Sequence, residues 1–385
     1  MGAPQSRLYE TAVGLKQRGW DVLVVTAMPN YPTGKIFDRY SGKLLMQDKV
    51  DGIDILRYAL YASNSRKSLP RIISMISFSV MVMFSLVRLR QFKPDYVFTE
   101  SPPLTLGLSG LILARLCGAR HVMNVSDLWP LSAYKLGAIS KGFIYNRLEG
   151  LERYLYKNSY ACTGQSQQIV SQLAESGSRY AHLYRNGVDV SRFDDQRPEP
   201  TPKHTRKLRI VYAGLLGVAQ GILDLCRNIN FAELGVEFHI YGEGAEKTEL
   251  ETFLLQHSNR ATYLHQSVKR NEVPITIMQY DATIIPLIKP IFGAIPSKIY
   301  EAMAAGLPII FTGGGEGAEI VQEYRTGWVC EPADYFAISN MVRQISAMEQ
   351  EELDIIRENC ILAARQVFNR ETQIERLNEF LLNAN

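Results

Sequence analysis

Residues 281–332 read DATIIPLIKPIFGAIPSKIYEAMAAGLPIIFTGGGEGAEIVQEYRTGWVCEP. The segment 281–287 is apolar and rich in β-branched residues without helical spacing, which predicts a strand buried on both faces. A loop must follow this strand as far as Pro296. Ser297 is then expected to be the N-cap of a helix that ends at Gly306.

The same order of elements is repeated directly afterwards. Segment 308–312 predicts a second strand, which leads through the glycine-rich segment 313–317 to a helix expected to begin at Ala318. The N-termini of both helices should therefore face one crevice at the end of the sheet. Unpaired N–H groups and positive helix-dipole ends meet there, and glycines allow close backbone approach, so the crevice favours an anion.

Two charged residues of the first helix are candidates for binding. Lys298 lies in the first helical turn, where a cation opposes the helix dipole unless it has a negative partner. Glu301 lies on the same face as Ser297, one turn further along, where its carboxylate would accept from a vicinal diol such as a ribose. The alternative is that both residues are ordinary solvated helix residues.

The chain resembles the retaining, metal-independent glycosyltransferases of the GT-B fold, family 4 in the usual grouping. It is most similar to bacterial polysaccharide transferases that use UDP-activated amino- or deoxy-sugars, such as the L-fucosamine transferases. The motifs occur in the family's order and cover nearly the whole chain: N-Y-P (30–32), S-D-L-W-P (126–130), N-G-V-D (186–189), Y-A-G (212–214), Y-G-E-G (241–244) and P-S-K-I-Y-E (296–301).

This resemblance implies an α/β protein with two Rossmann-like, doubly wound domains that face a central cleft. The polar, proline-spaced segment 191–207 is the clearest linker. We expect an N-terminal acceptor-binding domain at 1–190 and a nucleotide-sugar-binding domain at 208–358. The C-terminal helix, 359–385, is expected to cross back onto the N-terminal domain. The family's first strand is expected to be missing, because residues 2–4 resemble the loop that follows it.

The resemblance also assigns roles on the donor side. Lys298 would bind the diphosphate, Glu301 the ribose, and Val268 with Lys269 the base. The glycine-rich loop 313–317 would bind the phosphates and the sugar, and backbone N–H groups at 292–294 could serve them too. The other expected donor-binding positions are Ser297, Gly214, Gly217, Gly242 and Gly293, besides Gly314, Gly315, Glu316 and Gly317 of the loop.

Three departures from the family pattern bear on catalysis. Val218 and Gln220 stand where many relatives have an arginine and a lysine, which leaves Lys298 as the main cation for the diphosphate. Gly293 stands where the broad family has the first glutamate of a Glu-x7-Glu motif. This glutamate is also missing in the polysaccharide subgroup. No D-x-D motif replaces that carboxylate, so neither a metal nor another cofactor is expected.

The acceptor side is assigned to loops of the N-terminal half. Glu100 and Asp127 follow predicted strands, at the sheet edge where open α/β proteins bind ligands. Asp127 is a candidate for contacting the acceptor hydroxyl, although a lone aspartate there is also typical of a helix cap. Ser126 replaces a histidine found in many relatives. Asn30 and Tyr31 lie in a loop that the resemblance gives to the acceptor.

An apolar segment with basic flanks suggests a membrane contact. Residues 72–87 are apolar almost throughout, but 16 residues fall short of the roughly 18 needed to span a bilayer. Within 66–93 the basic residues are Arg66, Lys67, Arg71, Arg88, Arg90 and Lys93. Basic flanks on an apolar helix favour an anionic membrane surface. A buried core helix remains the alternative.

Composition excludes several classes. A chain of 385 residues with 46% hydrophobic residues can form two α/β domains. A formal charge of +3 is too close to neutral to indicate nucleic acid. The five scattered cysteines show no zinc-ligand spacing and are consistent with a cytosolic protein. No charged segment followed by an apolar one begins the chain, so no secretory signal is predicted.

The sequence therefore predicts a UDP-sugar-dependent glycosyltransferase that acts on a lipid-linked saccharide at the inner face of the cytoplasmic membrane. Two other functions stay open. A sugar-nucleotide epimerase of the same fold would need paired acid and base groups, which are not found. A catalytically impaired nucleotide-sugar-binding partner would fit Val218, Gln220 and Gly293. The sequence does not identify the sugar, the acceptor or the linkage.

Overall fold

The computed structural model describes residues 3–31, 33–65, 68–135, 137, 139–195, 207–288 and 292–383. These residues form two compact units, one of residues 1–185 with 374–385 and one of residues 186–373. The first change of unit thus precedes segment 191–207, most of which lies outside the described residues. At its start, Ser191–Asp194 forms helix α8, and Phe193 is fully buried in the core of the second unit.

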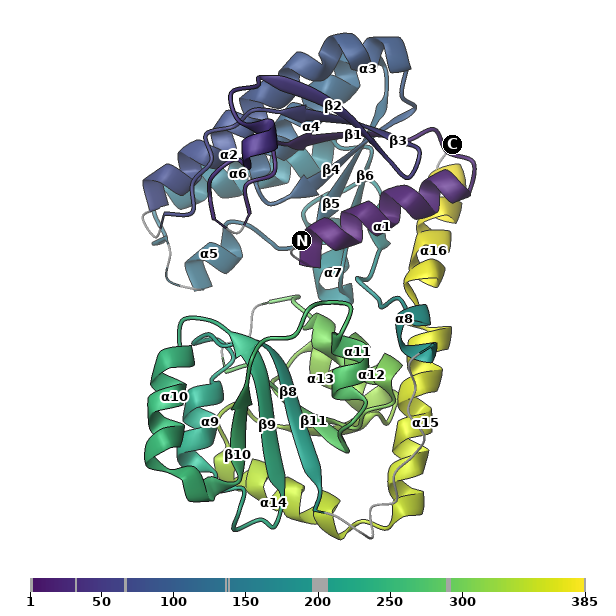
Figure 1. The fold of residues 1–385 in the computed structure, drawn as a ribbon. Coiled ribbons are helices and arrows are strands. Elements are labelled where there is room, and N and C mark those ends of the chain that lie inside the picture. Colours follow the sequence, from purple (N-terminus) through teal and green to yellow (C-terminus); the bar gives the residue numbers. More distant parts are fainter. Residues whose placement is uncertain are drawn as a thin grey trace. The chain divides into compact units, whose positions relative to one another are not determined.

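The second unit is built on one parallel sheet with the strand order β10-β9-β8-β11-β12-β13 (Figure 1). In chain order this is 3-2-1-4-5-6, the order of a doubly wound nucleotide-binding fold. The strands are β8 (Arg209–Leu215), β9 (Glu237–Glu243), β10 (Thr262–His265), β11 (Ala282–Pro286), β12 (Ile309–Thr312) and β13 (Gly327–Cys330).

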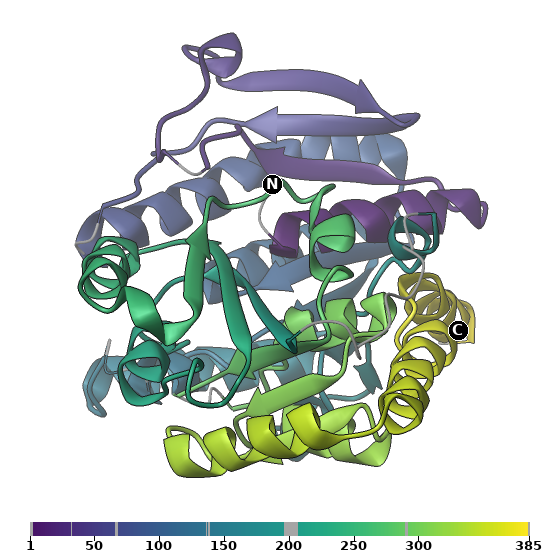
Figure 2. The same cartoon turned by 60° about the horizontal axis from the view of Figure 1, so that its bottom comes forward.

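Helices cover both faces of this sheet, as expected for a parallel sheet whose strands β11 and β12 are buried throughout. Val211 and Ile285 pack in one core, whereas Ile210 and Ile284 pack in the other. The helices are α9 (Ile222–Asn228), α10 (Lys247–Gln256), α11 (Val273–Ile277), α12 (Ser297–Ala305), α13 (Glu316–Glu323), α14 (Tyr335–Ala347) and α15 (Gln350–Gln366). Figure 2 shows the same arrangement from a second direction.

The first unit contains two sheets. A three-stranded sheet has the order β1-β3-β2, and a four-stranded parallel sheet has the order β4-β5-β6-β7. The strands are β1 (Leu23–Ala27), β2 (Leu45–Val50), β3 (Ile53–Tyr58), β4 (Tyr96–Ser101), β5 (Arg120–Val125), β6 (Ala161–Gly164) and β7 (Ala181–Leu183). The helices are α1 (Ala3–Gln17), α2 (Ser68–Met81), α3 (Leu86–Phe92), α4 (Leu104–Cys117), α5 (Leu131–Lys135), α6 (Phe143–Asn158) and α7 (Gln167–Glu175).

The C-terminal helix α16 (Arg370–Asn383) packs on the first unit from Ile374 onward. Leu377 and Leu381 are buried in one core cluster with residues of β5 and β6. Trp20 Nε1 donates to Asn378 Oδ1 at 2.8 Å, and Arg18 forms an ion pair with Glu375 at 2.6 Å. Of the expected segment 359–385, residues 374–385 thus group with the first unit, whereas residues 359–373 group with the second.

The apolar segment of the first unit is longer than predicted. Helix α2, the 3₁₀ turn η2 (Val82–Ser85) and α3 follow one another without a break, and Leu69–Phe92 forms a helix of 24 residues. The estimate of 16 residues was wrong because it counted only the apolar core and left out both helical ends. By length and composition this helix is able to cross a membrane.

Candidate active site

The carboxyl ends of the parallel strands gather the predicted donor residues of the second unit. The loops after β8, β9, β11 and β12 all leave the sheet at this edge, and α12 and α13 begin there. Neither helix has a side-chain cap at its N-terminus. Within the first turns, Ile299 N–H donates to the Pro296 carbonyl, and the N–H groups of Ala318 and Glu319 donate to the Gly315 carbonyl. Both helix dipoles favour an anion at this edge.

The start of α12 differs from the prediction. Pro296 is the N-cap and Ser297 is the first helical residue, so the expected side-chain cap from Ser297 was wrong. Pro296 holds φ at −59° with an extended ψ of 124°, so the chain already turns into the helix one residue earlier. The expected end at Gly306 is confirmed, because this residue is a left-handed C-cap with φ 65°. Helix α13 begins at Glu316 instead of Ala318.

Lys298 lies against the end of β8. Its Nζ is 5.5 Å from the centre of the Tyr212 ring, close enough for a cation–π contact. A Cβ atom at Gly214 would lie 2.1 Å from Lys298 Cε and 2.5 Å from Nζ. The glycine of the Y-A-G motif is therefore required by the path of the lysine side chain. Burial lowers the pKa of Lys298, and the Glu301 carboxylate partly offsets this.

Glu301 is partly buried one turn further along α12. Burial raises the pKa of its carboxyl, whereas Lys298, Arg192, Arg270 and Arg370 lower it. Neither Lys298 Nζ nor the Glu301 carboxylate makes a hydrogen bond or an ion pair with another of the described residues. Two partly buried, opposite charges without such partners are the arrangement expected of groups that bind a ligand.

In the glycine-rich loop after β12, Gly313 is closely packed and Gly314 borders open space. A Cβ at Gly313 would lie 2.7 Å from the Phe311 ring, while no atom lies within 4 Å of one at Gly314. Gly315 has φ 68° and ψ −158°, a conformation available essentially to glycine alone. Gly317 packs on the same ring, and the side chain of Glu316 is buried at the start of α13.

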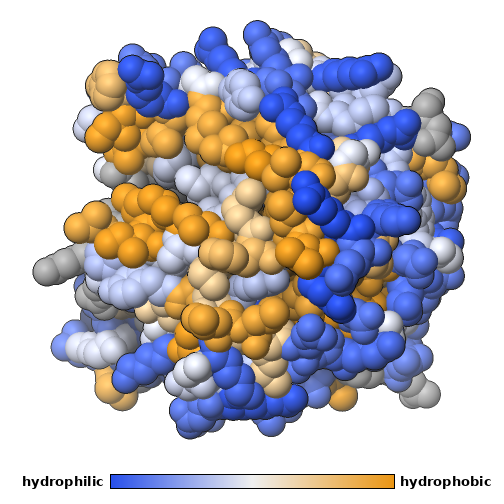
Figure 3. All heavy atoms as spheres, turned by 90° about the horizontal axis from the view of Figure 1, so that it is seen from above, coloured by the Kyte–Doolittle hydropathy of each residue, from blue (hydrophilic) through white to orange (hydrophobic). Residues whose placement is uncertain are grey.

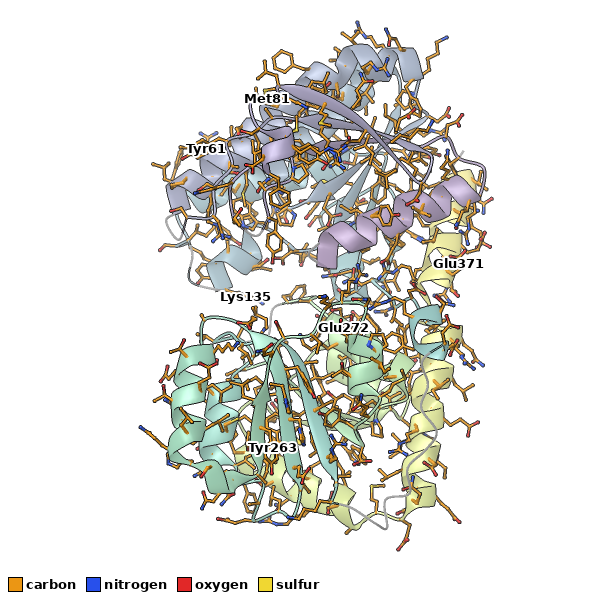
Figure 4. The ribbon with its side chains drawn as sticks, viewed as in Figure 1. Tyr61, Met81, Lys135, Tyr263, Glu272 and Glu371 are labelled. Atoms are coloured by element: carbon orange, nitrogen blue, oxygen red, sulfur yellow. The ribbon has the colours of Figure 1, made fainter. Side chains whose placement is uncertain are left out.

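The remaining donor-side positions lie in neighbouring loops. A Cβ at Gly242 would lie 2.2 Å from the Gly214 carbonyl oxygen, so the two glycines let β8 and β9 approach closely at this edge. Gly217 follows β8, and Gly293 precedes α12 with φ 72°. Val268 and Lys269 follow β10, where Lys269 N–H donates to the Glu272 carboxylate at 3.1 Å; Glu272 is labelled in Figure 4.

On the first unit, Glu100 is the centre of a polar cluster at the end of β4. Arg7 of α1 donates to Glu100 Oε1 at 2.6 Å and to Ser126 Oγ at 2.6 Å. Asn124 Nδ2 donates to Glu100 Oε2 at 2.7 Å, and Ser126 Oγ also contacts this carboxylate. The structure thus brings together the ends of β4 and β5, as predicted, but much of the Glu100 carboxylate is occupied by protein donors.

Asp127 lies just beyond β5, and its carboxylate accepts from Ser132 at the start of α5. Burial raises the pKa of Asp127, while hydrogen bonds from Ser132 and the Leu128 N–H lower it. Glu152 of α6 is buried nearby, and its burial raises its pKa to about 7, with a further increase from Asp127. The Asp127 charge thus acts on the buried Glu152 carboxyl in this unit.

Asn30 and Tyr31 follow β1. The Asn30 side chain donates to the Met28 carbonyl at 2.9 Å, and its own carbonyl accepts from Gly34 N–H at 2.8 Å. These bonds close the N-Y-P turn. The Tyr31 ring is 61% exposed, so it is accessible to a ligand.

Two family models match the two halves of this chain. Residues 2–187 match the glycosyl transferase 4-like domain, and residues 194–367 match the glycosyl transferases group 1. The chain belongs to the glycosyltransferases. Among the curated relatives, WcaI of Escherichia coli K12, described as a putative colanic acid biosynthesis glycosyl transferase, is 24% identical to this chain over 354 residues. That similarity covers 87% of this chain and 84% of WcaI.

The fold of the glycosyltransferase is GT-B, as its similarity to solved structures shows. Sucrose-phosphate synthase from Thermosynechococcus elongatus matches with a TM-score of 0.74 at 17% identity, over 100% of this chain and 94% of that one. Anabaena Alr3699/HepE, in complex with UDP and glucose, matches with a TM-score of 0.69 at 14% identity, over 100% of this chain and 96% of that one.

Several residues around the candidate site of this glycosyltransferase were not predicted. Tyr212 under Lys298 was quoted only as part of a motif, and Arg192 and Arg370 act on Glu301 from distant parts of the chain. No sequence spacing connects these arginines. Glu152 did carry a signal, because it lies four residues before Tyr156 and three before Leu155 on the buried face of α6.

Proposed function

We propose that this glycosyltransferase transfers a sugar from a UDP-sugar to a lipid-linked saccharide with retention of the anomeric configuration. The sugar is an amino- or deoxy-sugar such as L-fucosamine, and the product enters a cell-surface polysaccharide of the O-antigen or capsule type. The reaction requires no metal and takes place at the inner face of the cytoplasmic membrane. The similarity to WcaI supports the polysaccharide pathway, and the UDP in the HepE structure supports the nucleotide.

The observation that carries this proposal is the pair Lys298 and Glu301 at the start of α12. A nucleoside diphosphate presents a ribose diol and two adjacent phosphates. Glu301 accepts hydrogen bonds from the diol, and Lys298 lies one turn closer to the helix N-terminus, where the phosphates meet the positive dipole ends of α12 and α13. Val268 and Lys269 flank the base.

Catalysis follows from charge. As the bond between the sugar and the diphosphate breaks, negative charge grows on the leaving phosphate, and a fixed cation in a partly buried site stabilises that charge more than in water. The Tyr212 ring contacts the Lys298 ammonium, and Gly214 leaves room for the lysine side chain, before the donor binds. Asp127 is the proposed contact for the acceptor hydroxyl, with Glu100, Asn30 and Tyr31 on the same side.

Nucleotide binding tests the donor assignment directly. Thermal unfolding is measured with UDP, UMP, GDP and a panel of UDP-sugars. A ligand at 100 times its Kd stabilises the folded protein by about 2.7 kcal/mol, so a specific donor raises Tm clearly. We expect UDP to exceed UMP and GDP, and Glu301→Gln to reduce the shift. Glu323→Gln, an exposed carboxylate on α13, is the control and should leave it unchanged. Equal shifts with all nucleotides would contradict the assignment.

The other two functions are outcomes of a second experiment with the best donor. Transfer to an acceptor supports the proposal. Interconversion of the free sugar nucleotide would indicate an epimerase, and binding without turnover of any acceptor mixture would indicate a nucleotide-sugar-binding partner.

A further inference from the structure

The helix Leu69–Phe92 of the first unit has one face that no other part of the described unit covers. Only 22% of its most apolar stretch of 18 residues is buried. Seven exposed side chains are spaced three and four residues apart and lie along one side of the helix. These seven, called the apolar face, are Leu69 (67%), Ile72 (47%), Ile73 (44%), Ile76 (45%), Val80 (56%), Phe84 (67%) and Val87 (66%). Met75 and Phe92 are also exposed, outside this line.

The opposite side fixes the helix to the unit. Ser79, Val82, Ser85 and Leu89 are buried. Ser79 Oγ donates to Thr105 Oγ1 at 2.8 Å, and Ser109 Oγ of α4 donates to the Ser79 carbonyl at 2.7 Å. A helix that crossed a bilayer would have to break these bonds and leave the core formed by Val82, Leu89 and Leu113. The helix is therefore held at the surface of the unit, with its apolar face outward.

Charge at both ends of the apolar face is of one sign. Segment 66–93 contains basic residues and no aspartate or glutamate. Arg71 lies near the beginning of the helix, and Arg88, Arg90 and Lys93 lie near its end; all four are exposed. Arg66 and Lys67 lie outside the described residues. Figure 3, seen from the side on which β2 and α3 lie in Figure 1, shows hydrophobic side chains gathered in bands with hydrophilic ones around them.

We propose that the apolar face lies flat in the headgroup region of an anionic lipid bilayer, with the basic side chains at both ends bound to lipid phosphates. An exposed apolar stripe between cationic ends matches the interfacial helix in both respects. The sequence left two alternatives, a membrane-surface helix and a buried core helix. In our proposal each describes one side of this helix: one side is core, and the other side is the membrane contact.

A second copy of the chain is a poorer occupant. A two-fold interface through this face would pair Arg71 of one copy with Arg88 and Arg90 of the other if the helices were antiparallel, and each arginine with its own counterpart if they were parallel. Like charges would then face each other at both ends of the contact. Lipid phosphates neutralise the same charges. Because membrane binding does not depend on the transfer reaction, the two proposals are tested separately.

The test is flotation of the purified protein with vesicles of phosphatidylcholine alone or mixed with phosphatidylglycerol. We expect binding to the anionic vesicles and its loss at high salt. The triple variant Arg71→Gln, Arg88→Gln, Arg90→Gln should bind roughly a hundredfold more weakly, since each charge near the surface contributes about fivefold. Its matched control replaces exposed helical arginines elsewhere: Arg147→Gln, Arg153→Gln and Arg343→Gln.

The apolar contribution has its own pair of variants. Val80→Ser with Phe84→Ser should weaken binding at least tenfold, on the order of the loss expected for two partly inserted side chains. Leu255→Ser with Phe336→Ser removes side chains of the second unit that are 84% and 77% exposed, and should have no effect. Every variant must keep the cooperative thermal unfolding of the parent protein without ligand, which shows that it is folded.

Three results would overturn the proposal. One is the absence of binding to anionic vesicles, and another is binding that the face variants and their controls weaken equally. The third is a concentration-dependent dimer in vesicle-free solution that Val80→Ser with Phe84→Ser dissociates, which would assign the face to a second copy.

Discussion

Gly214→Ala moves the Lys298 ammonium without removing it, and so tests whether its position matters. The added Cβ would lie 2.1 Å from Lys298 Cε, whereas ordinary contacts begin at 3.4 Å, so Cε must retreat by about 1.3 Å. The clash is with the flexible end of a side chain, and the nearest other atom, Tyr212 Oη, is 3.3 Å away. We therefore expect the ammonium to be displaced; because φ at Gly214 is 159°, a conformation that side chains rarely adopt, Tm should fall as well.

A displacement of about 1 Å costs on the order of a hundredfold in rate when the group acts on the reacting atoms. Lys298→Ala should lower kcat by a factor on the order of a hundred or more, because the growing diphosphate charge loses its cation. Lys298→Arg should restore only part of the kcat lost in Lys298→Ala, since a planar guanidinium replaces a compact ammonium. Steady-state kinetics with a saturating donor gives kcat for each variant.

The double variant decides the interpretation. In the Lys298→Ala background there is no Cε to displace, so Gly214→Ala should change kcat by less than about threefold, and the two effects should be far from additive. Gly150→Ala, where the added Cβ meets no atom within 4 Å, is the control and should not change kcat. The reasoning fails if Gly214→Ala lowers kcat equally in both backgrounds, or if Lys298→Ala changes only KM.

Three further outcomes are expected. Glu301→Gln should raise donor KM about tenfold to a hundredfold with little change in kcat, because its ribose contact is equal in ground and transition states; a kcat effect of the same size would refute this in steady-state assays. Gly315→Ala should lower the free energy of unfolding by about 1–3 kcal/mol, and Tm with it, because φ 68° with ψ −158° excludes a side chain. An unchanged melting curve would contradict this expectation. The pKa of Glu152, about 7 in the folded protein, lies above its ordinary 4.5, so this carboxyl favours folding fully below pH 4.5 and progressively less up to pH 7. Glu152→Gln should therefore gain stability relative to the parent as pH rises from 4.5 to 7, by on the order of 3 kcal/mol, and parallel Tm–pH curves would disprove this.

The sequence predicted those parts of the fold that depend on local pattern. Residues 281–287 and 308–312 carry β-branched residues on both faces, and the structure buries β11 and β12 completely. Gly306 ends α12 as expected because a left-handed C-cap favours glycine. The return of the last helix was predicted from family resemblance, and Leu377 and Leu381 now supply its contacts.

Other features depend on contacts between distant residues and could not be predicted. The N-cap was misassigned because a serine before a helix usually caps it, whereas Pro296 already fixes the entry of the chain. Gly214 was expected only to contact the donor, and the proximity of its backbone to the Lys298 side chain, more than eighty residues later in the sequence, was not predicted. The three arginines near Glu301 likewise converge only in the folded unit.

The most direct test of the transfer reaction combines the best UDP-sugar from the Tm panel with lipid-linked saccharides in detergent or vesicles. UDP release is followed over time, and the anomeric configuration of the product is read from its proton NMR coupling constants. We predict UDP release that requires the acceptor and falls on the order of a hundredfold in Lys298→Ala, with a product of the same anomeric configuration as the donor. Inversion at the anomeric carbon, or UDP release that Lys298→Ala leaves unchanged, would contradict it.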